Sequence, residues 1–108
     1  MRIRYCRVVS ESEFVAAGEL LRVLSAPVRL AIITRLAEGS APVHALTEVL
    51  GLSQPLVSQH LRVLRAARLI TVTAHGRERV YALADEHVGH IVADAVRHSS
   101  EEELSPSH

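Results

Sequence analysis

The chain has 108 residues, 48% of them hydrophobic, which is enough for one small domain with an apolar core and too short for two. Its twelve basic and twelve acidic residues cancel, and its single cysteine, Cys6, excludes an intrachain disulfide and leaves secretion without support. No apolar run is long enough to cross a bilayer, and residues 1–9 lack the apolar core of a signal peptide, so we expect a cytoplasmic protein without a membrane partner.

Two helices are predicted in the first third of the chain, after a flexible segment at residues 1–9. The first helix begins at a capping box formed by Ser10 and Glu13. Its apolar residues recur at helical spacing; they are Phe14, Ala17, Leu21 and Leu24. The second helix has Ser25 as its expected N-cap, Pro27 in its first turn and Gly39 as its stop.

Two further helices are joined by a very short connection. The stretch "APVHALTEVLG" predicts a short third helix that Gly51 closes, and the fourth helix follows with Ser53 as its cap and Pro55 in its first turn. A three-residue connection that contains glycine is typical of a helix-turn-helix. We therefore expect the third and fourth helices to form that motif.

The remainder of the chain contains a hairpin and one more helix. The stretch "ITVTAHGRERVYAL" has two short β-branched runs around a turn at His75-Gly76, which predicts a β-hairpin. The last helix begins near Asp85, and residues 104–108 form a polar tail that we expect to be flexible. The predicted fold class is mainly α with a β-hairpin wing. It is a winged helix-turn-helix over residues 10–103, which dimerises through its terminal helices.

The fourth helix separates apolar from polar side chains. The apolar face, with His60 at its edge, should pack inward and consists of Leu56, Val57, Leu61, Val63 and Leu64. The other face has small and polar groups followed by arginine, which suits a helix lying in the major groove of double-stranded DNA. From residue 54 to 80, five arginines accompany one glutamate. We assign DNA contacts to Ser53, Gln54, Ser58, Gln59, Arg62, Arg65, Arg77 and Arg79.

These residues have different expected roles. Serine and glutamine can hydrogen-bond to base edges or phosphates, whereas Arg62 and Arg65 should contact phosphates, which position the protein without specifying sequence. Two wing arginines can reach the neighbouring backbone or minor groove. The competing interpretation is a small helical domain with ordinary surface arginines. The basic charge, the short turn and the basic hairpin occur together, which favours DNA binding. We expect His44 and His60 to be structural.

The last helix has an apolar stripe flanked by histidines. The stripe consists of Val88, Ile91, Val92, Ala95 and Val96, and it needs a surface to pack against. His87 and His98 are eleven residues apart, so they lie on the same flank of the helix but about 16 Å apart along its axis. A zinc–nitrogen bond is only about 2.0–2.1 Å long. The two imidazoles therefore cannot hold one metal ion within one helix.

Pairing with a second copy of the helix would remove this obstacle. In an antiparallel pair across a two-fold axis, one register places His87 opposite His98 of the other copy and Asp85 close to Glu101. Two imidazoles and two carboxylates form a closed tetrahedral set suited to Zn²⁺, with Co²⁺ as a plausible mimic. Spacing alone does not separate this metal site from a simple dimerisation helix whose His and Glu side chains are solvated. His90 falls outside this register, and we interpret it as a surface group or an accessory one.

The chain resembles the bacterial metal-sensing repressors of the ArsR/SmtB family from about residue 14 to 103. The segment "LSAPVRLAIITRLAEG" is similar to the family's second helix, and "LGLSQPLVSQHLRVLRAARLI" is similar to its recognition helix and the entry to its wing. The segment "GRERVYAL" resembles the returning wing strand. The tail resembles the family's interhelical zinc site, Asp-x-His followed by His and Glu, here Asp85, His87, His98 and Glu101.

The resemblance implies a homodimeric repressor, and not an enzyme. It would bind an inverted-repeat operator and be released when Zn²⁺ occupies two intersubunit sites per dimer. In the family, the metal-bound histidine is tied through its other ring nitrogen to the backbone that follows the recognition helix. By position, this pairs His98 with the region of Arg68.

Departures from the family pattern and other classes of function leave alternatives. The region "HALTEVL" has no Cys-x-Cys, which argues against sensing of soft metals. A nickel- or cobalt-responsive repressor is the nearest alternative, with His90 and His108 as candidate extra ligands, although the N-terminus lacks histidine. A winged-helix regulator without metal sensing is another. A metalloenzyme would need an open metal position, and a redox switch would depend on Cys6 alone.

Overall fold

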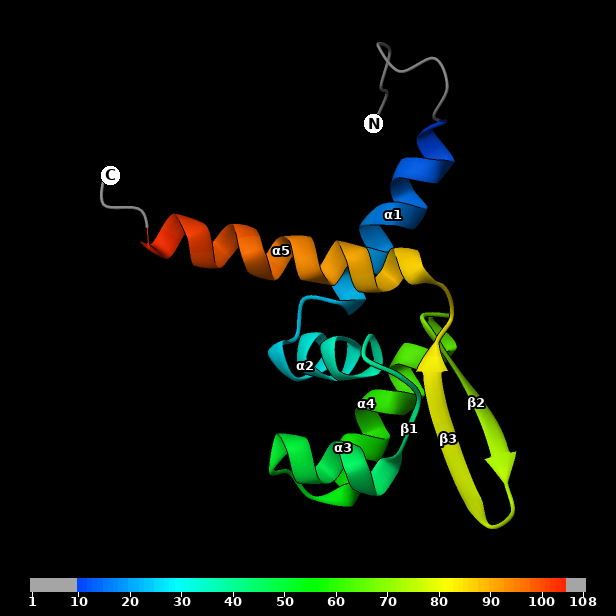
Figure 1. Ribbon diagram of the computed structural model, residues 1–108. Coiled ribbons are helices and arrows are strands. Elements are labelled where there is room, and N and C mark those ends of the chain that lie inside the picture. Colours follow the sequence, from blue (N-terminus) through cyan, green and yellow to red (C-terminus); the bar gives the residue numbers. More distant parts are fainter. Residues whose placement is uncertain (1–9, 105–108) are drawn as a thin grey trace.

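The computed structural model describes residues 10–104, and their side chains up to residue 100 (Figure 1). The elements follow the predicted order of four helices, a hairpin and a helix, with one very short strand added. They are α1 (Glu11–Val23), α2 (Pro27–Leu36), β1 (Ala41–Pro42), α3 (Val43–Leu50), α4 (Gln54–Ala66), β2 (Ile70–His75), β3 (Glu78–Leu83) and α5 (Glu86–Leu104). Among the described residues, no helix is long and apolar enough to span a membrane.

The first two helix starts differ in how well the sequence predicts them. The capping box at Ser10 is confirmed, because its side chain accepts from the Glu13 N–H and the Glu13 carboxylate accepts from the Ser10 N–H. The predicted cap at Ser25 is wrong. Ala26 is the N-cap of α2, and the Ser25 hydroxyl instead donates to the Arg22 carbonyl at 2.7 Å, at the end of α1. Helix α2 also ends at Leu36, three residues before the predicted stop.

The helix-turn-helix is confirmed in the pair α3 and α4. Gly51 adopts a left-handed conformation with φ of 66°, and its N–H bonds to the Thr47 carbonyl at 2.8 Å, which ends α3. Ser53 occupies the N-cap position of α4 as predicted, but its side chain makes no capping hydrogen bond. The helix start is therefore supported by Pro55 in the first turn rather than by a serine cap.

The hairpin forms an antiparallel sheet with the additional strand, in the order β1-β3-β2. Ala41 pairs with Tyr81, which ties the start of α3 to the wing. His75 pairs with Glu78, so the two turn residues are Gly76 and Arg77, one position later than predicted. Gly76 has φ of 65°, a conformation that two-residue hairpin turns require and that glycine adopts without strain.

The core lies between α2, α3, α4, the wing base and the first half of α5. It consists of Leu24, Ile32, Ile33, Leu36, Ala41, Leu46, Val57, Leu61, Leu64, Leu69, Ile70, Val88 and Val92. Helix α1 has no buried residue, and only its C-terminal end packs near the core, through Leu20 and Val23. Figure 1 shows α1 and α5 at one end of the molecule and the helix-turn-helix with the wing tip at the other.

Candidate functional site

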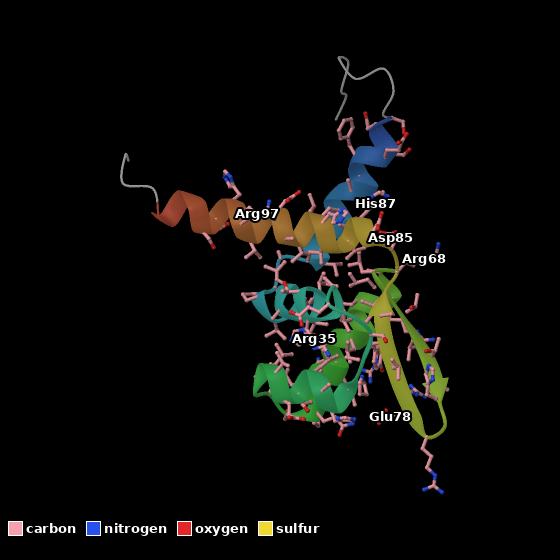
Figure 2. All side chains as sticks on the ribbon, viewed as in Figure 1. Arg35, Arg68, Glu78, Asp85, His87 and Arg97 are labelled. Atoms are coloured by element: carbon pink, nitrogen blue, oxygen red, sulfur yellow. The ribbon has the colours of Figure 1, made fainter. Side chains whose placement is uncertain are left out.

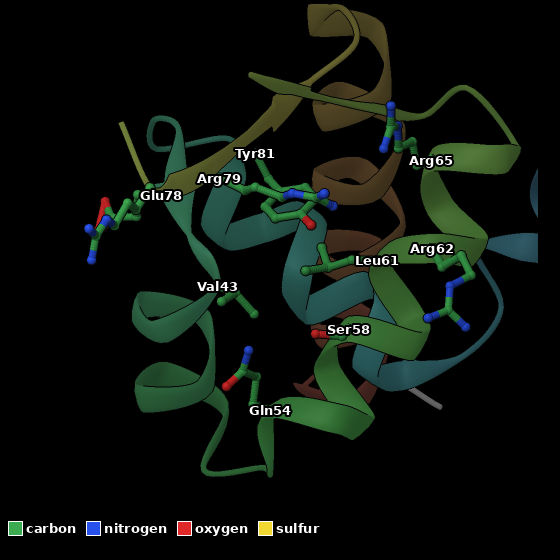
Figure 3. Close-up of a pocket in the computed structure, with 10 residues that line it drawn as sticks. Val43, Gln54, Ser58, Leu61, Arg62, Arg65, Glu78, Arg79 and Tyr81 are labelled. Carbon is green, nitrogen blue, oxygen red and sulfur yellow. The ribbon is translucent and has the colours of Figure 1, made fainter. Parts of the chain in front are cut away.

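A groove of about 500 Å³ opens between α4 and the wing. Six of the eight predicted DNA-contacting residues line it, namely Gln54, Ser58, Arg62, Arg65, Arg77 and Arg79 (Figure 3). Two arginines thus come from the helix and two from the hairpin. The arrangement is a concave surface with positive charge on both walls, which is suited to a polyanion.

Local structure explains why these side chains meet. Gln54, Ser58, Arg62 and Arg65 are spaced by four, four and three residues, so they lie along one face of α4. Val57, Leu61 and Leu64 on the adjoining face are buried in the core, which fixes the rotation of the helix. Arg77 lies in the hairpin turn, and Arg79 follows it on β3, across the groove from the helix.

Two of the predicted DNA contacts and one predicted core residue lie elsewhere. Ser53 and Gln59 are exposed but do not line the groove. Leu56 was predicted to pack inward, and this is wrong, because its side chain is 39% exposed. Val63 is half-buried, so it belongs to the margin of the core.

The sequence interpretation missed the uncharged and acidic members of the groove. Val43, Glu78 and Tyr81 also line it, so one carboxylate lies among the four arginines. His44, which we interpreted as structural, is exposed, and its Nε2 lies 3.2 Å from Oε2 of Glu78. These two residues are 34 positions apart, and no sequence pattern signals that contact.

His60 packs at the edge of the apolar face of α4, as predicted. It is half-buried, and its Nδ1 accepts a hydrogen bond from Nε of Arg29 on α2 at 3.2 Å. The pair therefore joins α2 to the recognition helix, on the side away from the groove.

The candidate metal ligands are spread along α5. Asp85 and His87 are exposed at the start of this helix (Figure 2), and Oδ1 of Asp85 accepts from the Val88 N–H at 3.2 Å. His98 is exposed further along α5, and the side chain of Glu101 lies outside the described residues, as do Cys6 and His108. Within the part of the chain that the structure describes, no three His, Cys, Asp or Glu side chains gather.

The residues at the start of α5 have the chemistry of half a metal site. Asp85 uses one lone pair of one oxygen to bond the helix N-terminus, which leaves acceptor capacity on the carboxylate. An exposed imidazole lies two residues away, at His87. Nitrogen and carboxylate oxygen donors together suit Zn²⁺, and also Co²⁺ or Ni²⁺. One end of α5 thus fits two ligands, and a complete site needs two more from elsewhere.

The apolar stripe of α5 is divided between two surfaces. Val88 and Val92, with 5% and 1% exposure, are buried against their own chain. The sequence predicted that the stripe needs a surface to pack against, and for these two valines that surface is their own chain, where α5 packs against α2. Ile91 and Val96 remain 39% and 46% exposed. A shallow apolar groove connects Ile91 and Ala95 with Leu21 and Leu24 from the end of α1 and with Leu30.

Comparisons with known proteins find related regulators. Residues 26–72 match the family model described as "Bacterial regulatory protein, arsR family". The chain is 54% identical over 89 residues to the transcriptional repressor SmtB of Mycobacterium tuberculosis, covering 82% of this chain and 66% of that protein. It is 43% identical over 79 residues to the regulator NmtR of the same species, covering 73% and 66%. A solution structure of apo-NmtR matches with a TM-score of 0.73 and 36% identity over 99% of this chain and 92% of that one.

Proposed function

The chain belongs to the ArsR family of bacterial regulatory proteins, and we propose that it is a metal-responsive transcriptional repressor that acts in the cytoplasm as a homodimer. Members of this family are DNA-binding regulators and not enzymes, and the relatives reported above are named as repressors or regulators. The observation that carries the proposal is the groove between α4 and the wing, which gathers four arginines and two hydrogen-bonding side chains on one surface.

The two walls of the groove serve different parts of a DNA duplex. Helix α4 lies in the major groove with its N-terminal half toward the bases, where Gln54 and Ser58 reach base edges. Arg62 and Arg65 contact phosphates along the same face. Arg77 and Arg79 extend from the wing to the neighbouring backbone or minor groove, so the protein spans adjacent surfaces of the duplex.

Dimerisation supplies the second half of the operator complex. Leu21 of α1 and Ile91 and Ala95 of α5 line one apolar groove, and Val96 of α5 is exposed as well. This apolar surface belongs to α1 and α5, which lie at the end of the molecule opposite the helix-turn-helix and the wing tip (Figure 1). A second copy covers this surface with its own α1 and α5. A two-fold dimer presents two recognition helices, which matches an inverted-repeat operator.

Metal binds between the two copies of α5. Asp85 and His87 from one chain and His98 and Glu101 from the other form each of two sites, in the antiparallel register that pairs residues 87 and 98. Bound there, Zn²⁺ would supply bonds to nitrogen and oxygen donors of both chains, and these bonds would fix one α5 helix against the other. A nickel- or cobalt-responsive repressor of the same family remains the second candidate, since Co²⁺ and Ni²⁺ accept the same donors.

The end of α4 is connected to the start of α5. The Ala84 N–H bonds to the Leu69 carbonyl at 3.0 Å, which places the backbone after Arg68 beside Asp85. His98 lies thirteen residues beyond Asp85, or about 20 Å along a helix. A link between His98 and the backbone near Arg68 therefore has to join the two subunits, from His98 of one chain to the turn after the recognition helix of the other.

A metal titration tests the proposed function. A duplex that the wild-type protein selects from a random-sequence pool serves as the DNA probe. Apo-protein is titrated with Zn²⁺, Co²⁺ and Ni²⁺ while binding to this duplex is followed by fluorescence anisotropy, with a chelator to reverse the effect. We expect Zn²⁺ to release the DNA. Selection of no duplex contradicts DNA recognition, and binding unaffected by all three metals contradicts metal sensing.

A complementation experiment tests the shared site. One variant lacks the first ligand pair (Asp85→Ala with His87→Ala), and the other lacks the second (His98→Ala with Glu101→Ala). Each homodimer should lose both tight zinc sites, whereas the mixed heterodimer should keep one intact site and bind one zinc tightly. A verified heterodimer without tight zinc contradicts the intersubunit site. Homodimers that keep two tight sites show that other residues are the ligands.

A further inference from the structure

Arg29 connects three helices through two hydrogen bonds. It lies near the start of α2, and its Nη1 donates to the carbonyl of Val23, the last residue of α1, at 3.0 Å. Its Nε donates to Nδ1 of His60 on α4 at 3.2 Å. Both bonds are partly buried. One planar guanidinium group thus holds the end of a terminal helix and the recognition helix together.

The bond to Val23 matters because α1 is weakly held by its own chain. No residue of α1 is buried, and Leu21 near its end is 54% exposed. The carbonyl groups in the last turn of a helix have no partner within that helix and carry partial negative charge. Arg29 supplies both a donor and a positive charge to this end of α1. The position of the end of α1 therefore determines where Arg29 finds its acceptor.

The bond to His60 acts on the back of the recognition helix. His60 is two residues from Ser58, about 200° around α4, so the imidazole lies nearly opposite a groove-lining side chain. Because Nδ1 accepts the bond, the ring proton of neutral His60 sits on Nε2. Arg29 therefore contacts α4 on the side opposite Ser58.

We propose that Arg29 is a positioning residue that transmits the docking of α1 in the dimer to the orientation of the recognition helix. This inference rests on the proposed function, because it assumes that a second copy covers Leu21 and its neighbours. Docking of that copy fixes α1, and α1 fixes Arg29 through Val23. Arg29 then fixes α4 through His60, so only a correctly formed dimer presents α4 in the DNA-reading orientation.

The test compares variants that break the link with variants that keep it. Arg29→Met removes both donors at similar length, and His60→Leu removes the acceptor. His60→Asn keeps an acceptor near the position of Nδ1. The matched control is Arg35→Met, because Arg35 is also a half-buried arginine of α2, and within the described residues its side chain bonds only to the Gly39 carbonyl, at 3.1 Å. Each variant is assayed for binding to the selected duplex and to a scrambled one.

We expect Arg29→Met and His60→Leu each to weaken binding to the selected duplex about tenfold, the loss of roughly one hydrogen bond to a charged group. The double variant should be no weaker than either single variant, because both break the same link. Binding to the scrambled duplex should stay near wild type in every variant. Binding of His60→Asn and Arg35→Met to the selected duplex should also stay near wild type. Unchanged specific binding overturns the proposal, and so does an equal loss on both duplexes, which indicates a general structural role.

A second measurement needs no DNA and so separates this inference from the proposed function. Leu21→Asp places a charge on the exposed end of α1 and should give a monomer, which sedimentation verifies. In the wild-type dimer the ring nitrogens of His60 should show the Nε2-protonated tautomer by NMR. In the monomer they should shift, while the ring nitrogens of His44 stay in place. A verified monomer with unchanged His60 resonances shows that α1 docking does not reach α4.

Discussion

Nε2 of His44 lies 3.2 Å from Oε2 of Glu78, and this pair joins the first turn of α3 to the first residue of β3. Both side chains are largely exposed, so the pair adds little to the stability of the fold. Its importance lies in its place, because Glu78 lines the groove between four arginines. Within the described residues, no arginine forms an ion pair with Glu78. Glu78 therefore contacts His44, and the four arginines of the groove remain available to contact phosphates.

The first prediction concerns the charge of Glu78. Glu78→Gln should strengthen binding to every duplex, selected or scrambled, because a carboxylate that repels phosphates is removed from the groove. Anisotropy titrations at several salt concentrations measure this change. Glu48→Gln is the matched control, since Glu48 is exposed on α3 and does not line the groove. Equal effects of the two substitutions would show that only net charge matters.

The second prediction concerns the wing arginines. Arg77→Ala and Arg79→Ala should each weaken binding to all duplexes alike and make the salt dependence shallower by about one counterion. Arg97→Ala is the control, because Arg97 lies on α5 with its Nη1 3.9 Å from Oδ1 of Asp94, and it does not line the groove. An unaltered salt slope for Arg77→Ala would remove that residue from the DNA surface.

The third prediction separates the two glutamines of α4. Substitution of a residue that reads a base edge should relax discrimination at one operator position by about 1–3 kcal/mol. We expect this effect for Gln59→Ala and for Gln54→Ala, although only Gln54 lines the groove. Affinities for single-base variants of the selected duplex measure it. If Gln59→Ala leaves the discrimination unchanged, base reading is confined to the wall of the groove.

The fourth prediction concerns coupling between metal and DNA. Zinc should weaken operator binding by about 1–3 kcal/mol, and operator DNA should weaken zinc binding by the same factor, because coupling is reciprocal. His98→Ala should abolish the effect while the apo-protein still binds DNA. His90→Ala serves as the control, as an exposed histidine of α5 outside the paired register. Tighter operator binding with zinc would contradict release by metal.

The fifth prediction concerns Arg68, which has φ of 63° in the turn that follows α4. The Leu69 N–H bonds to the Leu64 carbonyl at 3.0 Å, so this turn closes the helix with a residue in the left-handed region, where glycine is favoured. Arg68→Gly should raise the free energy of unfolding by up to about 1 kcal/mol, because side chains are strained there. Urea denaturation measures it. The zinc response should persist in this variant if the link to His98 uses only the backbone.

Local sequence determined the elements and one wall of the site. Of the apolar face that helical spacing predicts for α4, Val57, Leu61 and Leu64 are buried. Of the predicted polar face, Ser58 and Arg62 line the groove. Gly51 predicts the end of α3, because few other residues adopt the conformation that this turn needs. The β-branched runs predict the hairpin and place two arginines at its tip. These features depend on neighbours within a few residues, which the sequence displays directly.

Only the tertiary structure decided which distant residues meet. Packing of α2 against α5 buries Val88 and Val92 and leaves Ile91 and Val96 exposed, although all four lie on one stripe. Approach of α3 to the wing brings His44 to Glu78, and approach of α2 to α4 brings Arg29 to His60. Ser25 fits the sequence pattern of an N-cap for α2, yet its hydroxyl bonds to the Arg22 carbonyl at the end of α1. The physical reason is that such contacts depend on the relative placement of whole elements, which the burial of the shared core sets and no local pattern encodes.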